Sequence, residues 1–167
     1  MSKGTTYGRT MQSQALSTNG DGTGTVNANV DGGTPVAFKL TCPAGVHYEV
    51  ARLIVYIEDT GNLLAANYGA LGVLTNGVLV EVHDASGNPT GQLGHTLKSN
   101  SHWAKVCHDS SAHDYGSGNN AVSVRWTFQA AGESINLMPS ESLVVTIQDD
   151  LQGLVEHSFI AQFVQVR

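Results

Sequence analysis

The chain has 167 residues, of which 13% are charged and 19 are Gly, and its net charge is −6. A chain of this length most simply forms one domain, and few charges with abundant Gly are typical of all-β proteins with many turns. The acidic balance argues against a phosphate-binding surface, so no nucleic-acid partner is expected. The absence of a long apolar run predicts no membrane span and no membrane partner.

Two features bear on the compartment. The N-terminus lacks a continuous apolar stretch, so we expect no secretory signal. Cys42 and Cys107 are too few for a disulfide framework, and we expect both to be reduced in a cytosol-like compartment.

Residues 1–33 differ in composition from the rest of the chain. They are rich in Gly, Ser, Thr and Asn, with only scattered apolar residues at Met11, Leu16, Val26 and Val30. Such a segment buries too little apolar area to offset its ordering entropy by itself. We therefore expect an N-terminal arm that is either flexible or ordered by a neighbouring subunit. Its deletion should leave the remaining domain, residues 34–167, folded.

Packed structure is expected from Pro35. Residues 36–40 form a short predicted strand, and residues 42–45 combine Pro and Gly in a turn. Residues 50–59, extended as far back as His47, then read as the central strand. Leu53, Val55 and Ile57 would face one side of it and Ile54 and Tyr56 the other, and a strand apolar on both faces is usually covered on both. A short buried helix is the alternative.

The rest of the chain alternates between turns and strands. Further strands are predicted at 78–83, 122–128 and 154–166, with Leu143, Val145 and Ile147 marking one more inward face. Residues 62–68 predict a helical turn, and residues 99–108 predict a helix capped by Ser99 or Asn100. Residues 84–91 and 109–120 are predicted loops. Leu53, Val55, Ile57, Val124, Trp126, Val145 and Ile147 are the predicted core.

Together these elements give about six or seven strands with one or two short helices. We predict an all-β fold, an antiparallel β-sandwich whose leading topology is a jelly roll. A small closed barrel is the alternative.

Several short stretches between residues 45 and 163 carry a family resemblance. They are 51–61, 74–78, 124–128 and 149–154, with Trp103-Ala104 and Cys107, and 115–119. Together they resemble small virion structural proteins of tailed bacteriophages.

The resemblance implies a non-enzymatic protein on the capsid surface of the virion, made in the host cytoplasm. The foremost expectation is a capsid decoration (cement) protein that bridges and stabilises capsomers, with the major capsid protein as partner. Local threefold points on a shell favour a homotrimer. A neck or tail component is an alternative, and the polar arm is a feature that the resemblance does not explain.

The histidines suggest a metal site that their spacing does not support. His102, Cys107, His108 and His113 are potential zinc ligands close together in sequence. On a helix, however, His102 and Cys107 point in different directions, and no CxxC or HxxxH spacing is present. We predict no metal and no cofactor.

Catalytic patterns are equally weak. Gly116-Ser117-Gly118 lacks the strand-turn-helix context of a nucleophile elbow. The pairs Glu58-Asp59 and Asp149-Asp150 are adjacent, so they do not face each other as glycosidase carboxylates do, and calcium is the ligand that would suit them best. Residues 20–24 have no Lys and no following helix, so they do not form a phosphate loop. We predict no enzyme.

A carbohydrate-binding jelly-roll module is the second class of function. Such modules stack exposed aromatic side chains on sugars. Trp103, Tyr68 and Tyr115 are the only aromatic residues in predicted loops or turns that suit this role.

Overall fold

The protein is described by a computed structural model that covers residues 10–30, 33–60, 78–97, 108–114, 119–127, 135–147 and 154–166. Within these residues the chain is all-β, which confirms the predicted class. The strands are β1 (Met11–Ala15), β2 (Val36–Thr41), β3 (His47–Thr60), β4 (Val78–His83), β5 (Pro89–Leu97), β6 (His108–Asp114), β7 (Asn119–Thr127), β8 (Ile135–Leu137), β9 (Ser142–Ile147) and β10 (Glu156–Val166).

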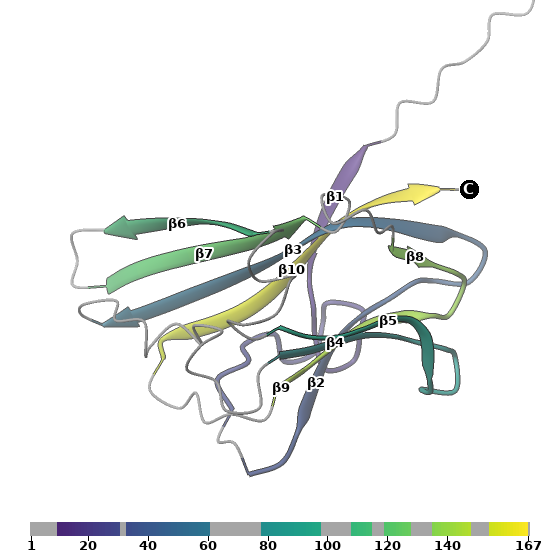
Figure 1. Cartoon of the computed structure of the whole chain (residues 1–167), viewed down its shortest axis with the longest axis horizontal. Helices are drawn as coiled ribbons and strands as arrows, with labels where there is room; N and C mark the ends of the chain where they lie inside the picture. Colours follow the sequence, from purple (N-terminus) through teal and green to yellow (C-terminus); the bar gives the residue numbers. More distant parts are fainter. Residues whose placement is uncertain are drawn as a thin grey trace, which may run out of the picture.

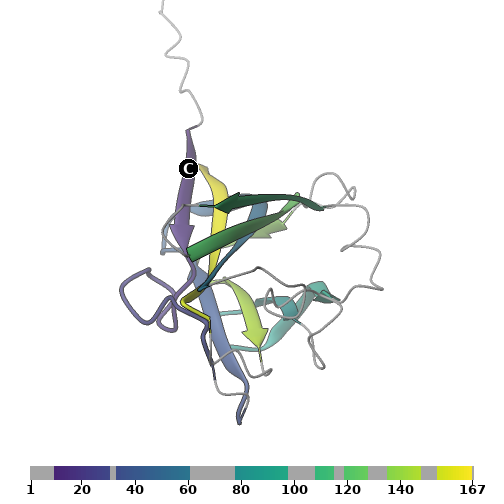
Figure 2. The same ribbon diagram turned by 90° about the vertical axis from the view of Figure 1, so that its left-hand side faces the viewer.

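The strands form two antiparallel sheets in a sandwich-like arrangement (Figures 1 and 2). Sheet A has the order β1-β10-β3-β7-β6, with β8 paired to the start of β3. Sheet B has the order β2-β9-β4-β5. The chain passes between the sheets repeatedly, so strands adjacent in sequence such as β1, β2 and β3 lie alternately in sheet A and sheet B.

The central position predicted for residues 50–59 is correct. β3 pairs with β10 on one side and with β7 and β8 on the other. Leu53, Val55 and Ile57 are buried on its inner face. From sheet B, Val145 and Ile147 are buried as predicted, together with Phe38 of β2. Phe159 and Phe163 of β10 are buried from the side of sheet A. The side chains of Val124 and Trp126 lie outside the described residues.

The structure differs from expectation in the N-terminal segment, because packed structure begins well before Pro35. β1 pairs with β10 along its whole length, from Met11↔Val164 to Ala15↔Ile160. Leu16 and Ala28 are fully buried in the core. Backbone hydrogen bonds also join Ser17 to Lys39 of β2. Residues 10–30 therefore lie on the body of their own chain. This packing argues against the expectation that residues 1–33 are dispensable for folding.

Two predicted loops contain strands. β5 begins inside 84–91, and β6 lies inside 109–120 except for its first residue, His108. The sequence of β6, His-Asp-Ser-Ser-Ala-His-Asp, shows no apolar alternation. It is an edge strand whose backbone pairs with β7 from His108↔Trp126 to Asp114↔Asn120, so pairing rather than side-chain burial defines it.

The two predicted helices fall almost entirely in parts of the chain that the structure does not describe. Residues 62–68 and 99–107 lie outside the described residues. His108, the last residue of the second predicted helix, begins β6 instead.

Candidate interaction surface

The outer face of sheet A is the surface that turns away from sheet B. This face has an apolar centre because the sequence of β3 is apolar on both faces. Ile54 and Tyr56 alternate with the buried Leu53 and Val55 and remain partly exposed. Ile160 of β10 lies directly opposite Ile54 and is also partly exposed. Cross-strand neighbours on one face lie about 5 Å apart, so Ile54 and Ile160 form one apolar patch.

Charged side chains lie at both ends of this patch. At one end, Arg52 donates from Nη1 to Oε1 of Gln162 at 3.3 Å. Arg125 of β7 lies in the same row as Ile54, beside the apolar patch. Arg52 Nε is buried and has no hydrogen-bond partner in the described part of the chain. At the other end, Glu58 lies directly opposite Glu156.

The two carboxylates at that end accept hydrogen bonds from hydroxyl groups on the same two strands. Tyr56 donates its hydroxyl to Oε2 of Glu58 at 3.0 Å, and Ser158 donates to Oε1 of Glu156 at 2.8 Å. Like charges directly opposite each other on neighbouring strands repel. This pair of acids would therefore be stabilised by a cationic group placed above it.

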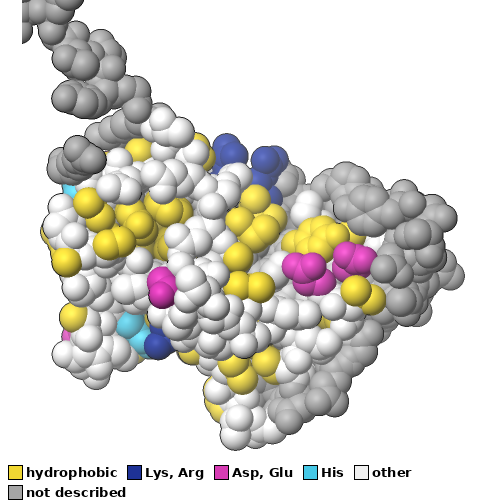
Figure 3. All heavy atoms as spheres, turned by 180° about the vertical axis from the view of Figure 1, so that it is seen from behind, with side chains coloured by type: hydrophobic (Ala, Val, Ile, Leu, Met, Phe, Trp, Pro, Cys, Tyr) yellow, Lys and Arg dark blue, Asp and Glu magenta, His cyan; other side chains and the backbone are white. Residues whose placement is uncertain are grey.

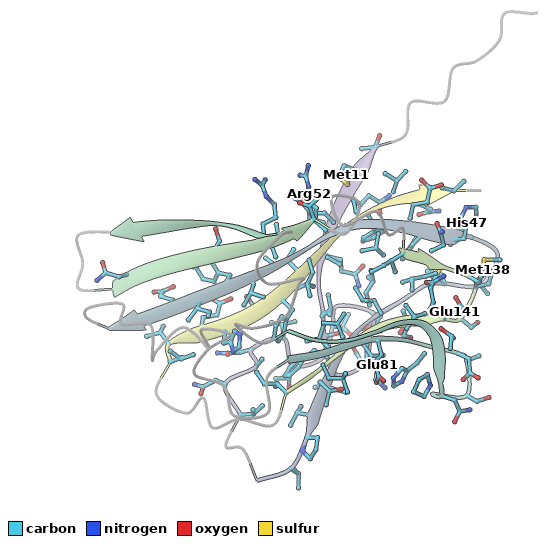
Figure 4. The ribbon with its side chains drawn as sticks, in the orientation of Figure 1. Met11, His47, Arg52, Glu81, Met138 and Glu141 are labelled. Carbon is cyan, nitrogen blue, oxygen red and sulfur yellow. The ribbon has the colours of Figure 1, made fainter. Side chains whose placement is uncertain are left out.

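The pictures agree with this layout. Figure 3 views the molecule from behind and shows hydrophobic side chains between a basic group and an acidic group. In Figure 4, Arg52 lies on the side of sheet A away from sheet B. An apolar centre with charged ends is the composition of a protein-binding surface.

The outer face of sheet B is more polar. His83 Nε2 lies 2.9 Å from Oε2 of Glu81, two residues earlier on β4. Ser142 lies opposite His83 on β9, but its hydroxyl hydrogen-bonds Thr41 Oγ1 at 2.9 Å. Ser142 is also buried. The three residue types of a Ser-His-Glu triad are thus close together, but the serine is oriented toward a threonine.

The Gly-rich residues 20–24 form a loop that is stabilised internally. Ser17 Oγ accepts hydrogen bonds from the N–H groups of Gly20 and Gly22 and donates to Asn19 Oδ1. Asn19 Oδ1 also accepts from the N–H of Gly24. The backbone donors that a phosphate would need are therefore used by the loop itself.

Among the described residues, the structure does not bring the other candidates from the sequence together. His108 and His113 lie five positions apart on β6, about 17 Å at the rise of a strand. No group of three potential metal ligands occurs in the described ranges. Glu58-Asp59 ends β3. The remaining candidates, His102, Cys107, Asp149, Asp150, Trp103, Tyr68, Tyr115 and 116–118, lie outside the described residues. Cys42 is a buried free thiol whose pKa is raised by burial.

Sequence reasoning missed a buried histidine. His157 is 1% exposed, and its ring packs against Phe159 in a tilted arrangement with ring centroids 4.9 Å apart. Its Nδ1 has no hydrogen-bond partner among the described residues. Its backbone is fixed by the N-terminal segment, because Asn27 Oδ1 accepts from its N–H and its carbonyl accepts from the N–H of Ala28. Burial lowers the pKa of His157 from 6.5 to about 4, so the ring is neutral at pH 7.

Comparisons with known proteins identify no relative: no family model matches, and neither the curated proteins nor the solved structures contain a match. In the part of the chain that the structure describes, no helix is suited to crossing a membrane.

Proposed function

We propose that this chain is a non-enzymatic structural protein of a tailed-bacteriophage virion, a capsid decoration protein with a jelly-roll body. The observation that supports this most is the strand order. The order β1-β10-β3-β7 in sheet A and the order β2-β9-β4-β5 in sheet B support a jelly roll, a sandwich built of two Greek keys. β6 and β8 are then additions to sheet A.

Jelly rolls are used by viral capsid proteins and by lectins. The resemblance of the short stretches described above selects the virion from these two. The proposed partner is the major capsid protein, and the proposed location is the capsid surface. A homotrimer at local threefold positions is the proposed assembly on the particle.

A decoration protein needs a rigid body with an apolar surface for attachment. The core between the two sheets meets the first of these needs. Binding free energy between such a protein and neighbouring capsomers would add to the resistance of the shell against internal pressure.

Electron microscopy of virions that contain this chain tests the proposal. We expect density at regular positions on the shell, which disappears from particles made without the chain and returns when purified protein is added. Density confined to the neck or tail would favour the alternative virion role. If the chain is absent from particles, the virion proposal fails, and specific binding on a glycan array would then favour the carbohydrate-binding module.

A further inference from the structure

We infer that the outer face of sheet A binds a second copy of this chain, face to face across a twofold axis. The inference uses only the register and charges of that face and does not rest on the proposed virion function. Its starting point is that the two ends of the face carry opposite charge along the direction of the strands.

A twofold axis that lies between the two faces, perpendicular to the strands, reverses the strand direction of the second copy. An axis that passes over the row containing Val55 and Phe159 places Arg52 over Glu58 of the other copy, since these residues are equally far from that row. It likewise places Gln162 over Glu156 of the other copy. Each cross-strand pair of acids thereby gains a guanidinium, and each contact occurs twice because the interface is isologous.

This arrangement brings opposite charges together across the interface. Glu58 and Glu156 are like charges opposite each other. Arg52 makes one hydrogen bond within the described residues, at 3.3 Å to an uncharged amide. A carboxylate from the second copy would give Arg52 a charge-assisted bond, and such bonds are about twice as strong as neutral ones. Between the charged ends, Ile54 and Ile160 would pack against the same face of the second copy.

The size of the face sets the expected strength. With the axis over Phe159, the rows that overlap run from Glu156 to Gln162, about 20 Å along β10, and about 19 Å across four strands. This gives about 380 Å² per copy and about 760 Å² in total, which is in the range of weak, transient interfaces. The expected complex is therefore a weak dimer whose population depends on protein concentration.

A charge swap tests the contact with the purified full chain. Sedimentation velocity from about 1 µM to about 1 mM, with a metal chelator present, should show conversion from the 17.6 kDa monomer to a species of twice that mass. Arg52→Glu and Glu58→Arg should each raise the dimer dissociation constant about tenfold or more, because each places like charges together twice. The double variant should restore it to within about threefold of the original value.

Rescue by the double variant is diagnostic because residues 52 and 58 lie about 20 Å apart within one chain and cannot pair there. Arg52→Gln serves if the charge reversal prevents folding, and it should weaken the dimer less. Lys39→Glu on sheet B, with the same charge change on the opposite layer, should leave dimerisation unchanged.

A monomer at every concentration would overturn the inference, as would a dimer or a trimer that is indifferent to the swap. Each of these outcomes is measured on free protein and leaves the question of the virion to electron microscopy.

Discussion

β3 and the N-terminal segment 10–30 reach the same core by different means. β3 has apolar side chains at every second position and hydrogen-bonded strands on both sides. The N-terminal segment places only Leu16 and Ala28 fully in the core. Val30 packs against the core from a partly buried position. Backbone groups and Ser and Asn side chains add many hydrogen bonds. A segment of low hydrophobicity thus becomes ordered when its polar groups are satisfied by the surface on which it lies.

Deleting the N-terminal segment should have the largest effect on stability and tests this difference most directly. Removing residues 1–30 takes away β1, the buried Leu16 and the hydrogen bonds to β2 and β10. We expect a loss of at least about 5 kcal/mol of unfolding free energy, which approaches the whole stability of a typical domain. Urea unfolding followed by circular dichroism measures it. Removing residues 1–9 alone leaves all of these contacts in place and should preserve most of the stability. An unchanged midpoint after the longer deletion would show that the segment is dispensable.

This contrast also explains which parts of the fold the sequence predicts. β3, β4 and β10 were found because their apolar side chains alternate or run continuously. β1 (Met-Gln-Ser-Gln-Ala) and β6 were missed because they are edge strands, defined by backbone pairing with a neighbour that sequence alone does not identify. Ser17 and Asn19 fall within the predicted N-terminal arm, although their side chains organise a loop.

The candidate surface was only partly predictable. The apolar second face of β3 indicated that Ile54 and Tyr56 need a cover. Ile54 lies opposite Ile160, and Glu58 lies opposite Glu156. Both pairings depend on the register between strands separated by about 100 residues, which no local pattern encodes.

A matched pair of leucines compares the two regions directly. Leu16 and Leu53 are both fully buried, one in the polar N-terminal segment and one in β3. Leu16→Ala and Leu53→Ala should each cost about 3 kcal/mol, within the range of about 2–5 for such truncations, because each leaves a cavity in the same core. Urea unfolding of both variants checks this. A cost below about 1 kcal/mol for Leu16→Ala alone would show that the N-terminal segment detaches without loss.

The pH dependence of stability tests the junction between the N-terminal segment and β10. The pKa of His157 is lowered from 6.5 to about 4 by burial, so the folded state resists protonation. The unfolded chain gains the proton first as pH falls. The free energy of unfolding therefore carries the full benefit of a neutral His157 above pH 6.5. It falls progressively between pH 6.5 and about pH 4, by about 3 kcal/mol in total.

The control for this prediction is His157→Gln, which cannot titrate in this range. The quantity compared is the slope of unfolding free energy against pH, because the six other histidines and the acids contribute to both proteins alike. The slope between pH 6.5 and 4 should be smaller in the variant. Equal slopes would mean that His157 is protonated in the folded state, and the buried junction would have to be open to solvent.

Two glycines provide the finest comparison, since they share a backbone conformation and differ in their surroundings. Gly20 has φ +85° and Gly45 has φ +82°, so Ala at either position should cost about 1 kcal/mol of backbone strain. A Cβ at Gly45 would meet open space, whereas at Gly20 it would overlap the Thr41 hydroxyl. Thr41 is fixed there, because its N–H donates to the Gly20 carbonyl at 2.8 Å and its hydroxyl pairs with Ser142. Gly20→Ala should therefore cost about 2 kcal/mol, through strain and the displaced threonine together, against about 1 kcal/mol for Gly45→Ala. Equal midpoints for the two variants in urea would indicate that the loop moves away from β2 without cost, and that the close contact of residue 20 with Thr41 does not hold the N-terminal segment in place.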